Sequence, residues 1–195
     1  MSNDRRRIAI LGGSFNPVHI GHLILADYAR VNCDFDEVWL MLSPLNPLKA
    51  DNSELLPDDI RLDMLRLALN DSPGLSECDI ELTMPRPSYT VDTLRELSRR
   101  YPDVDFTLLI GADNFAEFDR WKDTDEILRL ASVTVYPRPG YPMPDGSVPG
   151  ITPLDAPMIE ISSTDIRHSV SGDRLVAHML PVPVYRYIVS NNLYR

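Results

Sequence analysis

The sequence predicts an α/β protein in which a parallel β-sheet is flanked by helices, and three observations support this prediction. Short apolar runs of strand length occur along the chain, and segments with helical periodicity separate them. Such an alternation is typical of a parallel α/β sheet. The chain has 195 residues, of which 44% are hydrophobic, so it can build a sizeable core. We therefore expect one globular domain spanning residues 1–195.

In the first half of the chain, apolar runs and helical faces predict three strands and three helices. The first helix is expected to be largely buried, and the third strand has the alternating pattern of a half-exposed strand. Ser88 or Thr90 is expected to cap the third helix. The predicted strands cover 8–11, 37–43 and 78–82, the predicted helices cover 19–31, 58–70 and 88–101, and a loop is predicted over 44–57.

The second half of the chain continues the alternation. Asp123 and Glu126 have the spacing of a capping box at the start of a helix. The stretch 137–157 is rich in proline, glycine and aspartate, which predicts a surface excursion rather than a domain boundary. The predicted strands cover 105–111, 132–138 and 158–161, and the predicted helices cover 123–131, 162–170 and 181–194.

Composition and charge exclude several classes of function. The formal net charge of -10 argues against a general nucleic-acid binder, because no basic excess is available to neutralise phosphates. No apolar run approaches the roughly 20 residues needed to cross a membrane. Cys33 and Cys78 lack a metal-type spacing, and the N-terminal stretch lacks the apolar core of a signal peptide. We therefore expect a cytoplasmic protein with no nucleic-acid or membrane partner.

The stretch "GGSFNPVHIGH", residues 12–22, follows directly on the first predicted strand. In open α/β sheets, ligands bind beyond the carboxyl ends of the strands, so this turn is a privileged position. Gly12 and Gly13 allow the backbone to approach a ligand, and the helix that starts near His19 directs its free N–H groups to the same place. His19 and His22 lie three residues apart, so both imidazoles can reach one bound group. These features predict an anion site.

Other uses of this stretch are less consistent with its spacing. The pattern G-x-G-x-x-G would need glycine in place of Ser14 and Pro17, and a P-loop would need a Gly-Lys pair that does not occur. A zinc site is disfavoured because the H-E-x-x-H pattern is absent and neither cysteine is close in sequence. Two ordinary histidines at a helix start are the structural alternative.

Two motifs near opposite ends of the chain carry a resemblance to a known family. "GGSFNPVHIGH" resembles the nucleotidyltransferase signature G-x-F-x-P-x-H-x-G-H, and "ISSTDIR" at 161–167 resembles the second signature I-S-S-T-x-I-R. "PRPSYTVDTL" and "LLIGADNFAEFDRW" are similar to nicotinate-nucleotide adenylyltransferases. Pantetheine-phosphate adenylyltransferases share the first motif but are not expected to carry these two. The similarity covers nearly the whole chain and implies a Rossmann-like parallel sheet.

The resemblance implies a reaction and its partners. Adenylyl transfer from ATP to nicotinate mononucleotide would give deamido-NAD and pyrophosphate, with support from Mg²⁺. The ion is expected to be held by phosphates and water, so no protein ligand is assigned to it. The non-enzymatic alternatives are a catalytically silent nucleotide sensor and an assembly protein that uses the excursion at 137–157 as a contact surface. The sequence leaves a homo-oligomer open.

The resemblance also assigns an ATP site. The phosphates would be bound by imidazole donors, by a forked guanidinium and by groups at a helix start. His19, His22 and Arg167 are the expected catalytic residues, and the protonation of the histidines would matter between roughly pH 5 and 8. For Arg167 the alternative is a surface ion pair. The expected ATP-binding residues are Gly12, Gly13, Ser14, Phe15, His19, His22, Ser162, Ser163, Thr164 and Arg167.

Four further residues are expected to bind the acceptor nucleotide. Trp121 would stack on the pyridinium ring, with a core position as the alternative. Asp113 would accept hydrogen bonds from ribose hydroxyls or contact magnesium-bound water, unless it is a helix cap. The backbone N–H of Thr90 would bind the nicotinate carboxylate at a helix start. Lys49 lies where many relatives carry a proline-proline-histidine element and then a basic residue. Here Leu48 stands in place of the histidine. A ligand contact and a solvated surface lysine are therefore equally open for Lys49.

Overall fold

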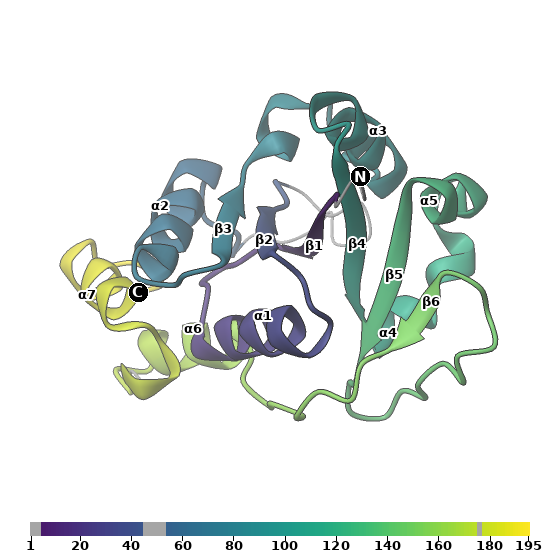
Figure 1. The fold of residues 1–195 in the computed structure, drawn as a ribbon. Coiled ribbons are helices and arrows are strands. Elements are labelled where there is room, and N and C mark those ends of the chain that lie inside the picture. The colour runs from purple at the N-terminus through teal and green to yellow at the C-terminus, as the bar shows by residue number, and fades with distance from the viewer. Residues whose placement is uncertain (1–4, 45–53, 175–176) are drawn as a thin grey trace.

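A computed structural model describes residues 5–44, 54–174 and 177–195 of the chain. Within these ranges, a six-stranded parallel sheet has the order β3-β2-β1-β4-β5-β6 (Figure 1). The predicted α/β fold class is thus confirmed. The strands are β1 Arg6–Gly13, β2 Glu37–Leu42, β3 Leu75–Cys78, β4 Val104–Gly111, β5 Ala131–Tyr136 and β6 Ile151–Pro153.

Helices cover both faces of the sheet (Figure 1). The α-helices are α1 Ile20–Asn32, α2 Asp58–Leu69, α3 Thr90–Arg100, α4 Ala112–Phe115, α5 Thr124–Leu130, α6 Ser163–Ser171 and α7 Val182–Ser190. Three 3₁₀ helices within the described ranges are η2 Ile80–Thr83, η3 Phe118–Arg120 and η4 Ala177–Met179. None of the helices in the described parts of the chain is long and apolar enough to cross a membrane.

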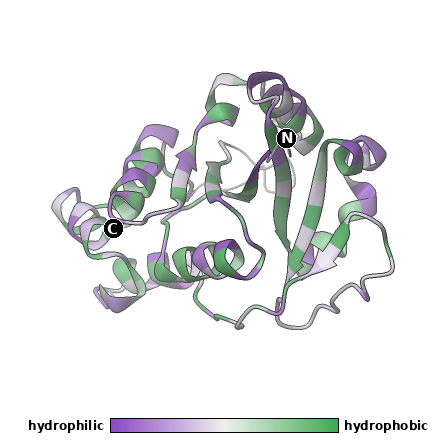
Figure 2. Cartoon of the chain, in the orientation of Figure 1, coloured by the Kyte–Doolittle hydropathy of each residue, from purple (hydrophilic) through white to green (hydrophobic). Residues whose placement is uncertain are grey.

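The alternation of side chains along β1 divides the core into two layers. Ala9 and Leu11 pack with buried residues of α1, α2, α6 and α7, whereas Ile8 and Ile10 pack with buried residues of α3 and α5. Successive side chains of a strand point to opposite faces, so both faces of a central strand must be apolar. Figure 2 shows this distribution, with hydrophobic colour along the strands and mixed colours on the helices.

The order of the strands creates the position for a ligand. β1 lies between β2 and β4, so the chain runs outward in both directions from the centre of the sheet. The connections leaving the carboxyl ends of β1 and β4 therefore pass to opposite faces, because α1 belongs to one layer and α4 to the other. The point where adjacent connections pass to opposite faces of the sheet is called the topological switch point. A crevice there is the general ligand site of open α/β sheets.

Two predicted strands are wrong. The residues at 78–82 do not form a strand, because β3 ends at Cys78 and Ile80–Thr83 is a 3₁₀ helix. Ile80 and Glu81 are adjacent and both buried, which a half-exposed strand does not permit. The sixth strand is not at 158–161 but earlier, at Ile151–Pro153, inside the predicted excursion. There Ile151 pairs with β5 and is buried, whereas Met158 is 55% exposed.

The predicted caps of two helices are wrong, whereas α6 does begin with a serine cap. Ser162 caps α6, since its Oγ accepts a hydrogen bond of 3.1 Å from the backbone N–H of Asp165. The cap position of α3 is Tyr89, so neither Ser88 nor Thr90 caps that helix. The capping box of α5 is absent: Asp123 makes no side-chain cap bond, and its backbone carbonyl accepts from the N–H of Glu126 at 3.0 Å.

The first helix is less buried than expected. Only Ala26 and Ala29 of α1 are buried among its residues, and Val31 is 57% exposed. The apolar residues of this segment cover a wider part of the helix surface than the stripe that contacts the sheet. Small side chains mark the stripe, which lets α1 lie close to the β-strands beneath it.

Candidate active site

A cavity of about 580 Å³ lies at the carboxyl ends of the central strands. Its walls include the ends of β1, β4 and β5, the start of α1, the start of α3 and the start of α6. Thirteen of the fourteen residues predicted for the site line it: Gly12, Gly13, Ser14, Phe15, His19, His22, Thr90, Asp113, Trp121, Ser162, Ser163, Thr164 and Arg167. The fourteenth, Lys49, lies outside the described residues.

Unpaired polar groups converge on this cavity. Within the described parts of the chain, five buried side-chain atoms have no hydrogen-bond partner, and all five belong to residues that line the cavity. Buried polar groups in native proteins are nearly always paired, so unpaired ones concentrated in one cavity indicate a polar ligand. The five atoms are His19 Nδ1, Ser88 Oγ, Trp121 Nε1, Asp113 Oδ1 and Arg138 Nε, of which the last two form an ion pair 3.6 Å apart, beyond hydrogen-bond distance.

The two histidines form one stacked unit at the start of α1. Their ring centroids are 3.6 Å apart, with an angle of 23° between the planes. His22 Nδ1 accepts a hydrogen bond of 3.1 Å from the backbone N–H of His19, and the backbone N–H of His22 donates to the carbonyl of His19 at 3.0 Å. Because Nδ1 of His22 is an acceptor, the proton of its neutral ring lies on Nε2. His22 therefore presents an N–H donor at its far nitrogen.

Both imidazoles are neutral at physiological pH. Burial, with a smaller effect of Arg138, lowers the pKa of His19 from 6.5 to about 4. The pKa of His22 is lowered well below its usual value by burial first, and then by His19 and Arg138. A low-dielectric site disfavours the charged form of an imidazole. The pKa of His19 therefore lies below the predicted range of pH 5 to 8, and that of His22 is shifted in the same direction.

One glycine of the first motif is required by the packing of Phe15. A Cβ on Gly13 would lie 3.0 Å from Cζ of Phe15, which is closer than ordinary contact, whereas a Cβ on Gly12 would meet only Met41, at 3.6 Å. Phe15 is buried, adopts a left-handed φ of 43° and places its ring edge-on to His22, with centroids 5.0 Å apart. Gly13 thus makes room for the ring that supports the second histidine.

Arg167 joins α6 to the β1–α1 loop, which comprises residues 14–19. Its Nη1 donates to the carbonyl of Asn16 at 2.9 Å, and its Nη2 lies 2.7 Å from Oε2 of Glu54. The side chain of Arg167 is 11% exposed and that of Glu54 is 53% exposed. The ion pair named as the alternative for Arg167 is therefore formed, although the same guanidinium also lines the cavity.

The hydroxyl groups at the start of α6 are already engaged. Ser162 Oγ donates to the carboxylate of Asp165 at 2.6 Å, and Ser163 Oγ donates to the carbonyl of Pro17 at 2.9 Å. The second bond fixes the N-terminus of α6 against the β1–α1 loop. Both ends of the chain thus contribute to one wall of the cavity.

The residues predicted for the acceptor also line the cavity. Trp121 follows η3 and packs against Phe118, with ring centroids 5.4 Å apart, while its Nε1 is unpaired. Asp113 lies in the first turn of α4, whose cap position is Gly111, so the alternative role of Asp113 as a cap is not observed. Thr90 is the first residue of α3, where backbone N–H groups are free of intrahelical partners.

Two wall residues were missed from the sequence. Arg138 follows β5 closely, and its Nε lies 3.6 Å from Oδ1 of Asp113. Its place just after a parallel strand is the signal that could have identified it. Glu81 is buried and accepts a 2.9 Å hydrogen bond from Oγ1 of Thr93, and burial raises its pKa. The wrong strand prediction at 78–82 placed Glu81 on an exposed face, so it was not considered for the site.

The described residues offer no protein cage for a metal ion. No group of three or more His, Cys, Asp and Glu side chains is placed to hold a cation within the part of the chain that the structure describes. Carboxylates do line the cavity, among them Asp113 and Glu81. This donor set suits a divalent cation that arrives bound to phosphates and keeps much of its water.

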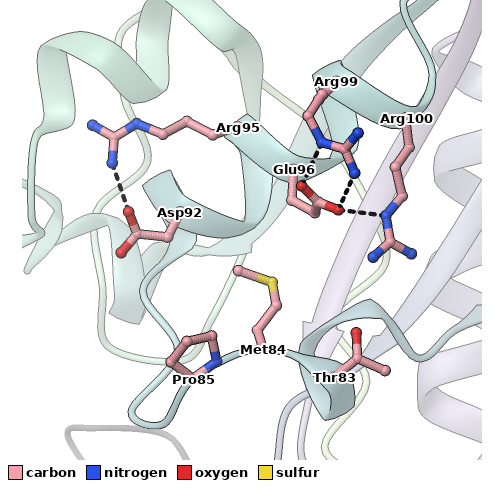
Figure 3. A pocket seen from close by; sticks show the side chains of 8 residues that line it. All are labelled: Thr83, Met84, Pro85, Asp92, Arg95, Glu96, Arg99 and Arg100. Carbon is pink, nitrogen blue, oxygen red and sulfur yellow. Dashed lines mark hydrogen bonds and ion pairs between the residues drawn. The ribbon is translucent and has the colours of Figure 1, made fainter.

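A second, shallower pocket of about 380 Å³ lies beside α3 (Figure 3). Its arginines are paired with neighbouring carboxylates: Arg99 and Arg100 contact Glu96, and Arg95 contacts Asp92 at 2.6 Å. None of its lining side chains carries one of the unpaired buried atoms found in the larger cavity, among the residues that the structure describes. The larger cavity is therefore the candidate active site.

Known proteins resemble this chain over most of its length. A family model described as cytidylyltransferase-like matches residues 10–169. The "Probable nicotinate-nucleotide adenylyltransferase" of Bacteroides thetaiotaomicron is 45% identical over 187 residues, which cover 95% of this chain and 92% of that protein. The protein of the same name from Flavobacterium johnsoniae is 40% identical over 193 residues, covering 97% and 99%.

A solved structure supports the fold independently. Plasmodium falciparum nicotinic acid mononucleotide adenylyltransferase complexed with NaAD superposes with a TM-score of 0.78 over 97% of both chains. The two sequences are only 18% identical. The similarity therefore concerns the arrangement of the sheet and its helices.

Proposed function

The chain belongs to the nicotinate-nucleotide adenylyltransferases, within the cytidylyltransferase-like family, and on that premise we propose that it transfers the adenylyl group of ATP to nicotinate mononucleotide. The products are deamido-NAD and pyrophosphate, so the reaction belongs to NAD biosynthesis. The observation that carries the proposal is that His22 and Arg167 line the same cavity as Trp121, Asp113 and Thr90. One wall suits a polyphosphate and the other suits a pyridine nucleotide.

The chemistry requires no nucleophile from the protein. An oxygen of the acceptor's phosphate attacks the α-phosphorus of ATP and forms the new P–O bond, while the bond to the β-phosphate breaks and pyrophosphate leaves. Alignment of the two substrates and stabilisation of the developing charge supply most of the rate. The protein's task is therefore to hold two phosphate groups in line.

Charge stabilisation is assigned to the wall formed by α1 and α6. The Nε2–H of His22 donates to a phosphate oxygen, and its neutral state costs no proton exchange during the reaction. Arg167 brings a forked, permanently charged donor to the polyphosphate. Its contact with Glu54 must be released or shared when the polyphosphate binds. The backbone and hydroxyl groups of Ser162, Ser163 and Thr164 lie at the same wall.

Recognition of the acceptor is assigned to the wall formed by α3 and α4. Trp121 stacks on the pyridinium ring, and its unpaired Nε1 gains a polar partner. Asp113 accepts from ribose hydroxyls. The free N–H groups at the start of α3 bind the nicotinate carboxylate, which favours an acid over an amide.

A divalent cation completes the proposal, and we assign Mg²⁺. The ion supplies charge neutralisation at the triphosphate when it is bound. The ion would be held by phosphate oxygens and water, and Asp113 in the cavity lining would be available to its water ligands. The partners are thus small molecules, and we place the reaction in the cytoplasm without a nucleic-acid partner.

Product identification tests this function directly. The purified chain is mixed with ATP, MgCl₂ and nicotinate mononucleotide, and the products are separated and weighed by mass spectrometry. Deamido-NAD and pyrophosphate should form in equal amounts. Binding of ATP without either product would leave the chain as a nucleotide sensor.

A further inference from the structure

A buried arginine lies behind the wall of the cavity rather than in it. The side chain of Arg61, on α2, is 0% exposed. All five of its N–H donors are engaged, because a guanidinium has five and five hydrogen bonds involve them. Burial of such a cation is costly unless its donors are satisfied. The five hydrogen bonds of Arg61 meet this requirement.

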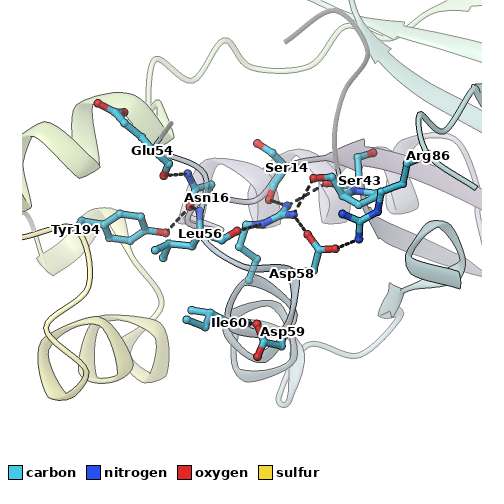
Figure 4. Close-up of polar contacts among 12 residues, drawn as sticks. Ser14, Asn16, Ser43, Glu54, Leu56, Asp58, Asp59, Ile60, Arg86 and Tyr194 are labelled. Carbon is cyan, nitrogen blue, oxygen red and sulfur yellow. Dashed lines mark hydrogen bonds and ion pairs between the residues drawn. The ribbon is translucent and has the colours of Figure 1, made fainter. Parts of the chain in front are cut away.

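The partners of Arg61 come from three segments of the chain, one in the β1–α1 loop and two at opposite ends of the β2–α2 connection. Its Nη1 donates to the carbonyl of Ser14 at 2.6 Å and to that of Ser43 at 3.0 Å. Its Nη2 donates to the carbonyl of Pro44 at 3.1 Å, and its Nε donates to that of Leu56 at 2.9 Å. Figure 4 shows Ser14, Ser43 and Leu56 arranged around these contacts. One side chain thus connects the segments that follow β1, follow β2 and precede α2.

These contacts orient groups that face the cavity. Ser14 and Ser43 both line the cavity, and their carbonyl groups point back to Arg61. The C=O and N–H of a trans peptide point in opposite directions, so the N–H of Phe15 is directed away from Arg61. The orientation of the peptide in the predicted ATP site is therefore set by a residue outside it.

An ion pair links Arg61 to the segment that precedes α3, whose start lines the cavity. Arg61 Nη2 lies 2.5 Å from Oδ1 of Asp58, and Oδ2 of the same carboxylate contacts Arg86 (Figure 4). Arg86 precedes α3 by four residues, and the start of α3 forms part of the acceptor wall. Asp58 therefore joins Arg61 to Arg86, which lies in the segment that leads into α3.

We propose that Arg61 is a positioning residue for adenylyl transfer, which fixes the β1–α1 loop against the segment after β2 and, through Asp58 and Arg86, aligns the acceptor wall with the ATP wall. This inference rests on the proposed function, which supplies the two substrates that must be aligned. Misplacement of reacting groups by about 1 Å can cost roughly 100-fold in rate, so a residue that touches neither substrate can control turnover.

The test compares two substitutions with matched controls. Arg61→Lys keeps the charge but removes the fork, and Arg66→Lys makes the same change on the exposed side of α2. Arg86→Ala cuts only the connection to Asp58, and Arg99→Ala removes another exposed, ion-paired arginine. Steady-state kinetics with ATP and nicotinate mononucleotide are measured well below the unfolding temperature. Calorimetric binding of each substrate alone is measured in parallel.

The expected results separate positioning from stability. Arg61→Lys should lower kcat roughly tenfold to 100-fold per folded molecule and weaken ATP binding, while Arg66→Lys changes neither. Arg86→Ala should raise KM and Kd for nicotinate mononucleotide severalfold, with ATP binding unchanged, while Arg99→Ala changes neither. A purely structural role would lower the unfolding temperature of Arg61→Lys but leave both kinetic constants of the folded enzyme intact.

The outcomes distinguish this inference from the proposed function. Wild-type protein that forms no deamido-NAD refutes the function, and the binding measurements then decide the inference alone. Folded Arg61→Lys with kcat and ATP affinity within about twofold of wild type overturns the inference. If Arg61→Lys does not fold, Arg86→Ala decides: a selective loss of nicotinate mononucleotide binding supports the alignment of the two walls, and unchanged binding overturns it.

Discussion

His19 and His22 stack with their ring centroids 3.6 Å apart, and the backbone N–H of His19 donates to Nδ1 of His22. This bond leaves Nε2 of His22 as the donor nitrogen of a neutral ring. The stacking and this hydrogen bond therefore fix the orientation of the two rings. Its predicted work is to stabilise charge on phosphate oxygens during adenylyl transfer.

Removal of the donor ring should impair turnover. His22→Ala is expected to reduce kcat by roughly 10²-fold, since a single preorganised donor to a developing charge has an effect of that order. The control is His178→Ala, which alters an exposed histidine on η4. Steady-state kinetics with saturating substrates provide the measurement, and an unchanged kcat would remove His22 from the mechanism.

Stability should depend on pH through His19. Its pKa is about 4 in the folded chain and 6.5 as an ordinary value, so the unfolded chain binds more protons between these limits. The contribution of neutral His19 to the free energy of unfolding is therefore fully present above pH 6.5. It falls by about 3 kcal/mol as the pH decreases toward 4. Urea unfolding at pH 7 and pH 4 should show this loss in wild type and a smaller one in His19→Gln. Equal losses in the two proteins would contradict the neutral, buried state of His19.

Loss of the indole should affect one substrate only. Trp121→Leu is expected to raise KM for nicotinate mononucleotide by roughly tenfold, because ring stacking and cation–π contact contribute about 1 kcal/mol or more. KM for ATP should stay the same. Trp39→Leu makes the same change in β2, where Trp39 packs against Tyr101 and Phe106 away from the cavity. A parallel loss of ATP binding in Trp121→Leu would indicate a folding defect instead.

The ion pair of Arg167 should compete with ATP. Its contact with Glu54 lowers the pKa of that carboxyl group, so Glu54 is charged at neutral pH. Glu54→Gln weakens the competing partner and is expected to lower KM for ATP severalfold, with kcat nearly unchanged. Glu77→Gln, on β3, serves as the control. An increased KM in Glu54→Gln would show that the carboxylate supports ATP binding rather than opposing it.

Much of the sheet and of the site could be predicted because the relevant signals are local. β1, β4 and β5 are apolar runs of strand length, and the helix start at Ser162 carries its own capping residue. Parallel strands place their carboxyl ends at one edge, which brings His19 and Trp121 to the same cavity from distant parts of the chain.

Other features depend on tertiary contacts that no local pattern encodes. Arg61 occupies a polar position of an amphipathic helix, yet it is buried because backbone carbonyls from the β1–α1 loop and from both ends of the β2–α2 connection converge on it. The strand at Ile151–Pro153 is short, and turn-forming residues flank it. The sequence therefore did not indicate that this segment pairs with β5. The neutral state of His19 follows from burial and from Arg138, which only the folded chain brings close.

The most direct measurement of the central claim is pyrophosphate release from ATP with three acceptors offered separately. Nicotinate mononucleotide, nicotinamide mononucleotide and phosphopantetheine are each supplied with the wild-type chain and MgCl₂. We predict release that is selective for the nicotinate form, because the start of α3 offers N–H donors to its carboxylate. Selective release with phosphopantetheine, or no release with any acceptor, would contradict the assignment.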